Sequence, residues 1–374
     1  MSGTAMTTPA GATSAGGSPG RSRPAWASSR ALKLAVLVIG LVVLALVPLS
    51  ARPYDNYQLS LVAVYAVAIL GLNIVSGYAG QISLGQSAFL GMGAYVTAYG
   101  VGHGWPLVLT FVAACLLPAV VGLIVAVPAV RLRGNALAVV TIILPIIAVP
   151  LAKRLERFTG GSDGVNVDWA HAPAWSGLAD DQWRYYVIVV LAALLFLVGR
   201  NIVTGRIGRA FAVVRTNEAV AASMGVSAHR YKVLAFTIAS FYGGAAGFLY
   251  LVAVQYTSPE LLSFLVTVNM LAALVIGGFM SIWGSLIAGF FFVYVPTIAG
   301  SVDASRTSIF YGAALLLVLF IVPGGVVGGV TRLGRLVTAK VTGRRPPATV
   351  DPLTEPPAVT STQQDTPVPD APTR

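Results

Sequence analysis

The stretch that decides the fold is Gly71–Gly100, GLNIVSGYAGQISLGQSAFLGMGAYVTAYG. It lies between two apolar runs, yet it contains seven glycines and several amides and hydroxyls. Unpaired polar groups are costly in hydrocarbon, and glycines let helices approach closely or break beside a cavity. Two interpretations follow: a buried segment that lines a membrane pathway, or a tightly packed helix pair whose amides are satisfied internally.

The composition is that of an α-helical protein with several membrane spans. The 374 residues include only 10% charged residues, whereas soluble domains carry about 25%. The mean hydropathy is +0.80. Cys115 is the only cysteine, so no intramolecular disulfide can form. We therefore expect an all-α, polytopic membrane protein.

Apolar runs near the roughly 20 residues that span a bilayer predict about ten transmembrane helices. They are Ala31–Leu49, Gln58–Ser76, Leu84–Gly100, Pro106–Val130, Ala136–Leu151, Tyr185–Val198, Val233–Val254, Phe264–Phe279, Trp283–Gly300 and Ile309–Val326. Pro145 and Pro150 are expected to kink or end the fifth span.

Three regions follow from this pattern. Residues 1–30 and 330–374 are rich in Gly, Ser, Thr and Pro and predict disordered tails around a transmembrane domain at 31–329. Most Lys and Arg residues fall on the side that holds both termini, which predicts that both termini are cytoplasmic. The long loop 200–231 is then cytoplasmic and the long loop 153–183 external.

The sequence does not carry the motifs of an enzyme. There is no G-x-x-x-x-G-K-[ST] loop for ATP and no H-E-x-x-H, and the three histidines lie in separate loops. The predicted spans contain essentially no acid or base, which disfavours a proton relay. We expect no catalytic residues, no metal site and no cofactor in this chain.

Smaller glycine motifs have two interpretations each. Gly243 and Gly247 form a G-x-x-x-G pair that predicts close helix packing. Thr159–Val165 either shapes an external mouth or forms a simple glycine-rich turn. The segment Gly277–Gly289 weakly resembles Gly77–Gly85, which hints at an internal repeat.

The cytoplasmic loop predicts one short amphipathic helix from Arg209 to Met224. Phe211, Val214 and Glu218 fall at helical spacing, and a glycine follows at position 225. Small residues on one face suit a groove on a partner protein, whereas the arginines also suit an anionic lipid surface.

Four motifs now carry a family resemblance. They are GLNIVSGYAGQISLGQSAFLGMGAY at 71–95, RLRGNALAVVT at 131–141, TGGSDGV at 159–165 and RTNEAVAASMGVSAHRYKVLAF at 215–236. In this order they closely resemble the branched-chain amino acid ABC transporter permeases, with the M-type subunit as the nearer match. The resemblance extends over about residues 71–323.

The resemblance implies a multi-pass permease subunit in a bacterial plasma membrane. Its partners would be a second permease subunit, two cytoplasmic ATP-binding cassette subunits that bind the ATP, and an extracytoplasmic substrate-binding protein. It further implies that Arg215–Gly225 is a coupling helix that docks on a cassette. The coupling residues are Arg215, Asn217, Glu218, Ala221, Ala222 and Gly225.

Polar residues of the opening stretch are the candidates for the substrate pathway. These are Asn73, Gln81, Ser83, Gln86 and Ser87, whose amides and hydroxyls can pass a zwitterionic solute without trapping it. The sequence departs from the family pattern in two places. Gln86 stands where the family often has His, and Ile146 where it often has Glu in the fifth span.

The expected function is therefore that of a permease for branched-chain or related small amino acids, driven by separate ATPases. The family also imports urea and short amides, which is the first alternative. An autonomous secondary transporter is the second alternative, because the missing ATP site fits it equally well. A membrane scaffold is the third, in which Gly71–Gly100 serves packing alone.

Overall fold

The computed structural model describes Pro48, residues 52–130, 136–169, 171–174 and 176–302, and Gly312. The predicted tails at 1–30 and 330–374 lie outside the described residues. So do the predicted first and tenth spans apart from Pro48 and Gly312, and the residues 131–135.

The described chain is helical, and the eight middle spans predicted from the sequence are all present as helices. They are α2 (Pro53–Leu72), α3 (Gln86–Gly102), α4 (Leu107–Ala129), α5 (Ala136–Arg154), α7 (Asp180–Thr204), α10 (Ala228–Val254), α11 (Phe264–Gly277) and α12 (Ile282–Val302). Short elements join them: the π-helix η2 (Asn73–Tyr78), α6 (Glu156–Thr159), β1 (Val165–Asn166), α8 (Arg206–Thr216), α9 (Glu218–Ser223), β2 (Tyr256–Thr257) and the 3-10 helix η3 (Pro259–Leu262). The all-α prediction is confirmed.

Four of the described helices are long and apolar enough to cross a membrane by length and composition. They are Pro53–Tyr78, Leu107–Ala129, Asp180–Thr204 and Ala228–Val254. Two shorter apolar helices, Phe264–Gly277 and Ile282–Ile298, accompany them. The chain is accordingly a multi-pass membrane protein, and the total of ten spans stays a prediction.

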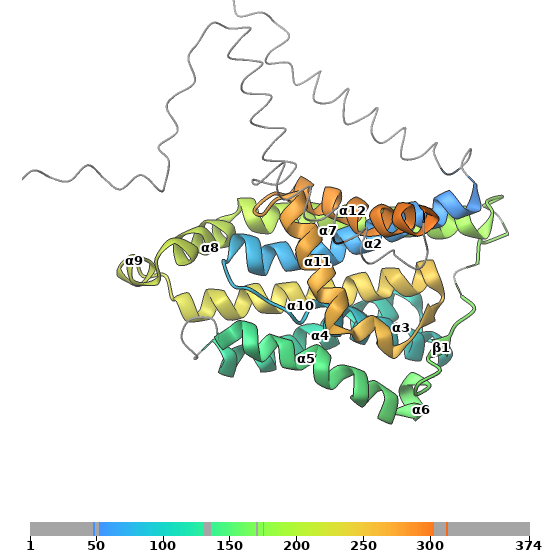
Figure 1. Cartoon of the computed structure of the whole chain (residues 1–374), viewed down its shortest axis with the longest axis horizontal. Coiled ribbons are helices and arrows are strands. Elements are labelled where there is room, and N and C mark those ends of the chain that lie inside the picture. Colours follow the sequence, from blue (N-terminus) through green and yellow to red (C-terminus); the bar gives the residue numbers. More distant parts are fainter. Residues whose placement is uncertain are drawn as a thin grey trace, which may run out of the picture.

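Most helices run along the long axis of the molecule, whereas α11 crosses it, and the longer connections gather at two ends (Figure 1). We call these the α9 end, where α8 and α9 lie, and the β1 end, where β1 and α6 lie. At the β1 end Val165 pairs with Thr257 in a two-stranded antiparallel sheet. This grouping agrees with the predicted topology, in which loops 200–231 and 153–183 lie on opposite sides.

The centre of the bundle is α10, which packs most extensively against α3 and α4. Glycines permit this approach: a Cβ on Gly247 would lie 2.1 Å from the Leu90 carbonyl oxygen. A Cβ on Gly243 would lie 2.7 Å from the Cβ of Phe89. The predicted packing role of this glycine pair is confirmed.

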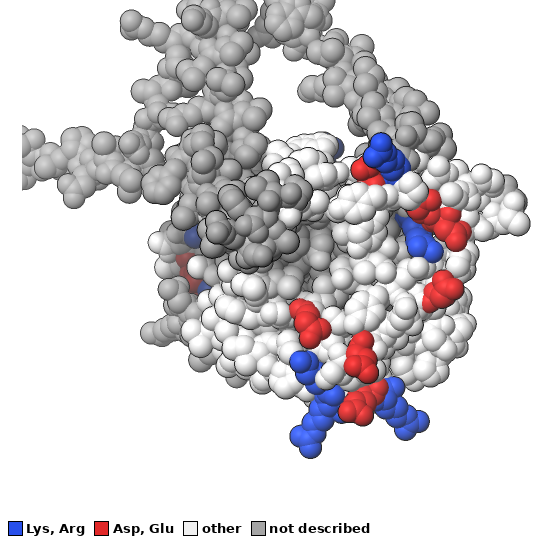
Figure 2. Space-filling model, turned by 45° about the vertical axis from the view of Figure 1, so that its right-hand side comes forward, with Lys and Arg blue, Asp and Glu red and all other residues white. Residues whose placement is uncertain are grey.

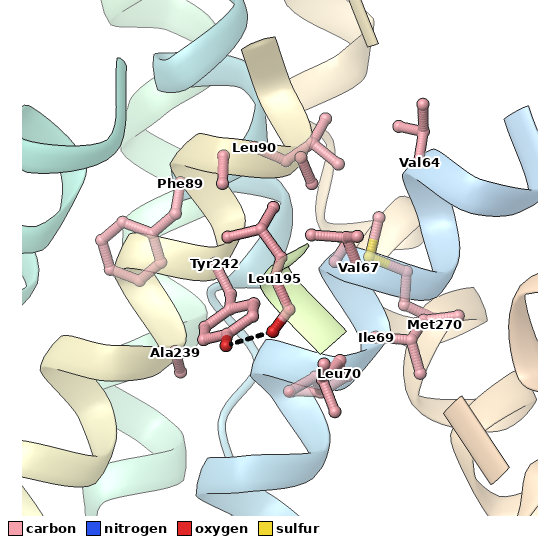
Figure 3. Packing of buried hydrophobic residues seen from close by; sticks show 14 of the residues in the cluster. Val64, Val67, Ile69, Leu70, Phe89, Leu90, Leu195, Ala239, Tyr242 and Met270 are labelled. Atoms are coloured by element: carbon pink, nitrogen blue, oxygen red, sulfur yellow. Dashed lines mark hydrogen bonds between the residues drawn. The ribbon is translucent and has the colours of Figure 1, made fainter. Parts of the chain in front are cut away.

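Buried apolar side chains of α10 pack against those of α2, α3, α7 and α11 (Figure 3). Tyr242 of α10 lies among them, and its hydroxyl donates a hydrogen bond to the Leu195 carbonyl oxygen of α7 at 2.8 Å. This bond satisfies a polar group that would otherwise be costly in an apolar core.

The fifth span differs from one expectation, because α5 runs through both Pro145 and Pro150. The alternative that a proline ends this helix is wrong. Pro145 has no N–H for the carbonyl of Thr141, four residues earlier. The Thr141 side chain joins α5 to the break between α2 and α3: its Oγ1 donates to the Ala138 carbonyl oxygen at 2.9 Å and accepts from Leu84 N at 3.0 Å.

Charged side chains lie at the helix ends. Figure 2 brings the β1 end forward and shows acidic and basic side chains side by side on it, not a field of one sign. The ion pair between Lys153 and Glu260, 3.9 Å apart, belongs to this end. The pair between Lys232 and Glu218 belongs to the α9 end.

Candidate functional site

The opening stretch of the sequence forms a break between α2 and α3. The chain leaves α2 through the π-helix η2 and continues without regular structure from Ala79 to Gly85. Gly80 has a φ of +70°, a backbone conformation that favours glycine. The amide N–H of Gln81 donates back to the Val75 carbonyl oxygen at 2.9 Å and holds the turn closed. π-helical turns are frequent at functional sites.

Asn73 begins this break and is completely buried. Its Nδ2 donates to the Ser281 carbonyl oxygen at 2.8 Å and to Ser285 Oγ at 3.0 Å. Its Oδ1 accepts the Met280 N–H at 3.0 Å. Asn73 therefore joins η2 to the turn between α11 and α12, and its side chain is fully used in that contact.

Gln86 and Ser87 open α3 and are also buried. Nε2 of Gln86 donates to the carbonyl oxygens of Ala68, at 2.9 Å, and Ala239, at 3.3 Å. Ser87 Oγ donates to the Leu262 carbonyl oxygen at 3.1 Å. The same Oγ accepts a hydrogen bond from Thr267 Oγ1 at 2.7 Å. These two residues connect α3 to α2, α10, η3 and α11.

Gln81 and Ser83 lie in the irregular segment, between the predicted spans Gln58–Ser76 and Leu84–Gly100. Ser83 N donates to Ser76 Oγ at 3.4 Å. Nε2 of Gln81 donates to the Lys232 carbonyl oxygen at 3.4 Å, whereas its buried Oε1 has no hydrogen-bond partner. A buried unpaired acceptor is uncommon and can serve a passing solute or a water molecule.

Four of the five pathway candidates separate into two groups. The donors of Asn73, Gln86 and Ser87 bond to neighbouring elements, as the interpretation of a tightly packed helix pair requires. Gln81 retains a buried acceptor, Oε1, that has no hydrogen-bond partner. A direct contact between any of the five and a substrate stays a prediction.

The predicted single helix from Arg209 to Met224 is wrong, because the segment forms two helices, α8 and α9. Asn217 separates them in an extended conformation, with φ −161° and ψ 119°. Its Oδ1 accepts the N–H groups of Ala219 at 2.8 Å and Val220 at 3.3 Å. Asparagine is a strong N-cap residue, so it starts a new helix here in place of continuing the first.

Gly225 ends α9 with a φ of +76°. Its N–H donates to the Ala222 carbonyl oxygen at 3.0 Å, and the Val226 N–H donates to the Ala221 carbonyl oxygen at 2.9 Å. This is the Schellman arrangement, which satisfies the last carbonyls of a helix. Strong caps at both ends therefore hold the six-residue α9 in shape.

Helix α9 has one buried face and one exposed face. Ala221 is completely buried, whereas Ala222 is exposed. Val220 is 46% exposed and Met224 is 68% exposed, so the outer face of α9 is apolar as well as small. Figure 1 shows α9 at the extreme end of the molecule, beyond the transmembrane helices.

Two charged side chains attach this loop to the rest of the protein. Arg215 Nη1 donates to the Gly77 carbonyl oxygen of η2 at 2.7 Å. Glu218 forms an ion pair with Lys232 near the start of α10. The predicted coupling residue Arg215 thus contacts the opening stretch Gly71–Gly100 through Gly77, 138 residues away in the sequence.

The glycine-rich motif Thr159–Val165 forms a turn at the β1 end. Gly160, Gly161 and Gly164 all have positive φ. A Cβ on Gly164 would lie 2.3 Å from the Thr257 carbonyl oxygen, and Tyr256 OH donates to the Asp163 carbonyl oxygen at 2.9 Å. The interpretation as a glycine-rich turn accounts for the motif, and contact with a binding protein stays a prediction.

Several partners in these contacts were missed from the sequence. Lys232, Thr267, Ser281 and Ser285 each bond to a candidate residue. The only signal was the weak likeness of Gly277–Gly289 to the first glycine-rich stretch, and the structure places part of that segment against Asn73. The family departure Ile146 is 57% exposed on α5, so it faces lipid or another subunit and not the interior.

The described part of the chain contains no cluster of side chains suited to bind a metal ion. No group of three or more His, Cys, Asp or Glu side chains there could hold a metal ion. His171 contacts Asp180, with 2.9 Å between Nδ1 and Oδ2, and lies 3.3 Å from Asp168. All three are solvent-exposed in or beside the external loop.

The sequence matches known proteins over most of this structure. A family model described as the branched-chain amino acid transport system permease component matches residues 56–321. The high-affinity branched-chain amino acid transport system permease protein LivM of Escherichia coli K12 is 30% identical over 262 residues, which is 63% of this chain and 61% of that protein. LivM of Salmonella typhimurium LT2 is 31% identical over 253 residues, 60% of this chain and 59% of that protein. The match therefore spans about three fifths of the LivM proteins.

A second type of permease is also similar. LivH of Escherichia coli K12 is 25% identical over 282 residues, 71% of this chain and 91% of LivH. Among solved structures, PsaBC from Streptococcus pneumoniae in complex with Fab has a TM-score of 0.41 and 13% identity, covering 75% of this chain and 96% of that one. A TM-score of this size supports no conclusion.

The identity to LivM exceeds that to LivH, which confirms the M-type resemblance. The family model matches 266 residues (56–321) of the 374, well over half of the chain. The chain therefore belongs to the family of branched-chain amino acid transport system permease components.

Proposed function

We propose that this protein is the permease subunit of an ATP-binding cassette importer for branched-chain amino acids or related small amino acids. The observation that carries the proposal is α9, a capped helix with an exposed apolar face at the end of the molecule. Such a helix suits a groove on a soluble partner. The chain acts as a transport subunit and not as an enzyme, because ATP is hydrolysed on the partner.

The proposed partners follow from this role. Two cassette subunits dock at the cytoplasmic face, where one contacts α9. A second permease subunit completes the membrane pathway, and a substrate-binding protein delivers the solute at the β1 end. The complex resides in the bacterial plasma membrane. LivM and LivH, both permease proteins of a branched-chain amino acid transport system, support a paired arrangement.

The attachment of α9 supports a coupling role over a lipid-binding role. A loop lying on anionic lipid needs only exposed arginines. Here Arg215 points to Gly77, and Glu218 pairs with Lys232. Rigid attachment allows movement of a partner subunit to be passed to the transmembrane helices as rigid-body motion.

The substrate class follows from the neutral interior. The described ion pairs lie at the ends of the helices, and the pathway candidates are amides and hydroxyls. A zwitterion or a neutral amide can exchange hydrogen bonds with such groups. Gln86, unlike histidine, carries no titratable proton, so the first residue of α3 stays neutral at every physiological pH.

Reconstitution into liposomes tests this proposal. The chain is purified alone and together with its second permease, cassette and binding-protein partners, and uptake of labelled leucine is measured with and without ATP inside. Uptake is expected only with the full set and ATP. Leucine exchange by the chain alone would instead establish a secondary carrier. ATP-dependent uptake of labelled urea or acetamide, without uptake of leucine, would identify an amide importer.

A further inference from the structure

Arg215, one of the predicted coupling residues, is exposed, yet its side chain bonds to the break between α2 and α3. Its Nη1 donates to the Gly77 carbonyl oxygen at 2.7 Å. Its aliphatic stem lies over Gly80, where a Cβ would be 2.7 Å from Arg215 Cγ. Because Gly80 has no side chain, the aliphatic part of Arg215 can pack on it. Both the aliphatic part and the guanidinium group of Arg215 therefore contact the break between α2 and α3.

The acceptor of this bond has a special position. Gly77 lies in the last turn of η2, where carbonyl groups have no partner within the helix. The C-terminal end of a helix also carries partial negative charge, which favours a cation. Arg215, supplied by α8 from another part of the chain, thus caps this helix end.

Gly77 also lies against the opposite side of the break. A Cβ at Gly77 would be 2.1 Å from Asn73 Oδ1 and 3.0 Å from Met280 N. Asn73 in turn bonds to the turn between α11 and α12 through Met280 N and the Ser281 carbonyl oxygen. One glycine therefore touches both the cytoplasmic loop and the α11–α12 turn.

Met280 adds a conformational constraint at this point. It has a φ of +60°, which is uncommon for a residue with a side chain. The Asn73 Oδ1 bond to Met280 N holds that turn in place. A shift of η2 would therefore act directly on the α11–α12 turn.

We propose that Arg215 is a positioning residue that passes displacement of α9 to η2, and through Asn73 to the turn between α11 and α12. This inference rests on the proposed function as a cassette-driven permease. The second attachment, Glu218 to Lys232, joins α9 to α10 and does not reach η2 directly. Loss of Arg215 should therefore leave α9 in place while its link to the α2–α3 break is removed.

The test uses the complete transporter in proteoliposomes with Arg215→Ala, Arg215→Lys and Arg209→Ala. Arg209 lies on the same helix and is exposed, so it controls for loss of positive charge. Assembly is followed by co-purification of the cassettes, and ATP hydrolysis and leucine uptake are measured on the same vesicles.

For Arg215→Ala we expect an assembled complex that hydrolyses ATP but takes up about 5- to 150-fold less leucine per ATP, the range typical of a lost coupling. Arg215→Lys retains the stem and the charge but not the planar fork, so it should recover part of the uptake. Arg209→Ala should behave as the wild type.

Two outcomes overturn the inference and leave the proposed function intact. Unchanged uptake per ATP in Arg215→Ala means that the bond to Gly77 carries no coupling. Loss of the cassettes from the Arg215→Ala complex, with Arg215→Lys equally defective, means that Arg215 is a docking residue. A wild-type complex that takes up leucine without ATP contradicts the proposed function itself.

Discussion

Replacement of Gly93 by alanine should separate the two helices at the centre of the protein. Gly93 of α3 faces Gly244 of α10, and a Cβ at Gly93 would lie 2.3 Å from the Gly244 carbonyl oxygen. The neighbouring atoms are backbone, at 2.7 Å for Gly244 Cα, so no side chain can rotate away. Relief requires movement of one helix against the other.

The size of the effect follows from these distances. Ordinary contact begins at 3.4 Å, so the helices must separate by 3.4 − 2.3, about 1 Å. A gap of 0.5–1 Å forfeits roughly a quarter to a half of the dispersion energy of each atom pair across the interface. Overpacking of this kind typically costs about 1–3 kcal/mol. We therefore expect Gly93→Ala to lower the free energy of unfolding by about 2 kcal/mol.

The measurement is reversible unfolding in mixed micelles with increasing SDS, followed by circular dichroism. Gly102→Ala is the matched control, because Gly102 ends the same helix and a Cβ there would meet no atom within 4 Å. The control should change stability by less than about 0.5 kcal/mol. If the two variants unfold at the same SDS fraction, the close α3–α10 crossing is not a determinant of stability and the reasoning is refuted.

Three further changes test other parts of the structure. Asn73→Ala removes the three hydrogen bonds of this side chain and should lower the free energy of unfolding by about 1–3 kcal/mol in the same assay. A loss smaller than that of Gly102→Ala would contradict this prediction. Asn217→Ala should destabilise α9 by about 1 kcal/mol, seen as faster amide exchange in α9 alone. The hydrogen bond to Asp180, followed by the charge of Asp168, raises the pKa of His171. The protonated imidazole therefore stabilises the loop 153–183 below pH 6.5, and this stabilisation is lost as the pH rises through the raised pKa. His171→Gln should abolish that pH dependence of loop exchange.

The sequence predicted the transmembrane framework well, because hydropathy is a local property of the chain. The span predicted at Pro106–Val130 is α4, Leu107–Ala129, and the one at Phe264–Phe279 is α11, Phe264–Gly277. The predicted cytoplasmic helix was less accurate. Hydrophobic spacing continues across Asn217, but the capping bonds of that side chain divide the segment in two.

The sequence predicted the two regions of the candidate site, Gly71–Gly100 and Arg215–Gly225, but not the contact between them. Amides and glycines in Gly71–Gly100 indicated burial, and all five pathway candidates are buried. Whether such amides bond to neighbours or face a solute depends on atoms from other helices. The Ser87 partner Thr267, for example, is 180 residues away in the sequence.

By itself, the sequence determined the helical membrane class, the positions of the spans and the family, since these depend on composition and on contiguous motifs. Only the tertiary structure decided that Arg215 bonds to Gly77, 138 residues away, and that Asn73 bonds to Ser281, 208 residues away. The physical reason is that a buried polar group takes its partner from whatever element packing brings within about 3 Å, and sequence distance places no limit on that choice.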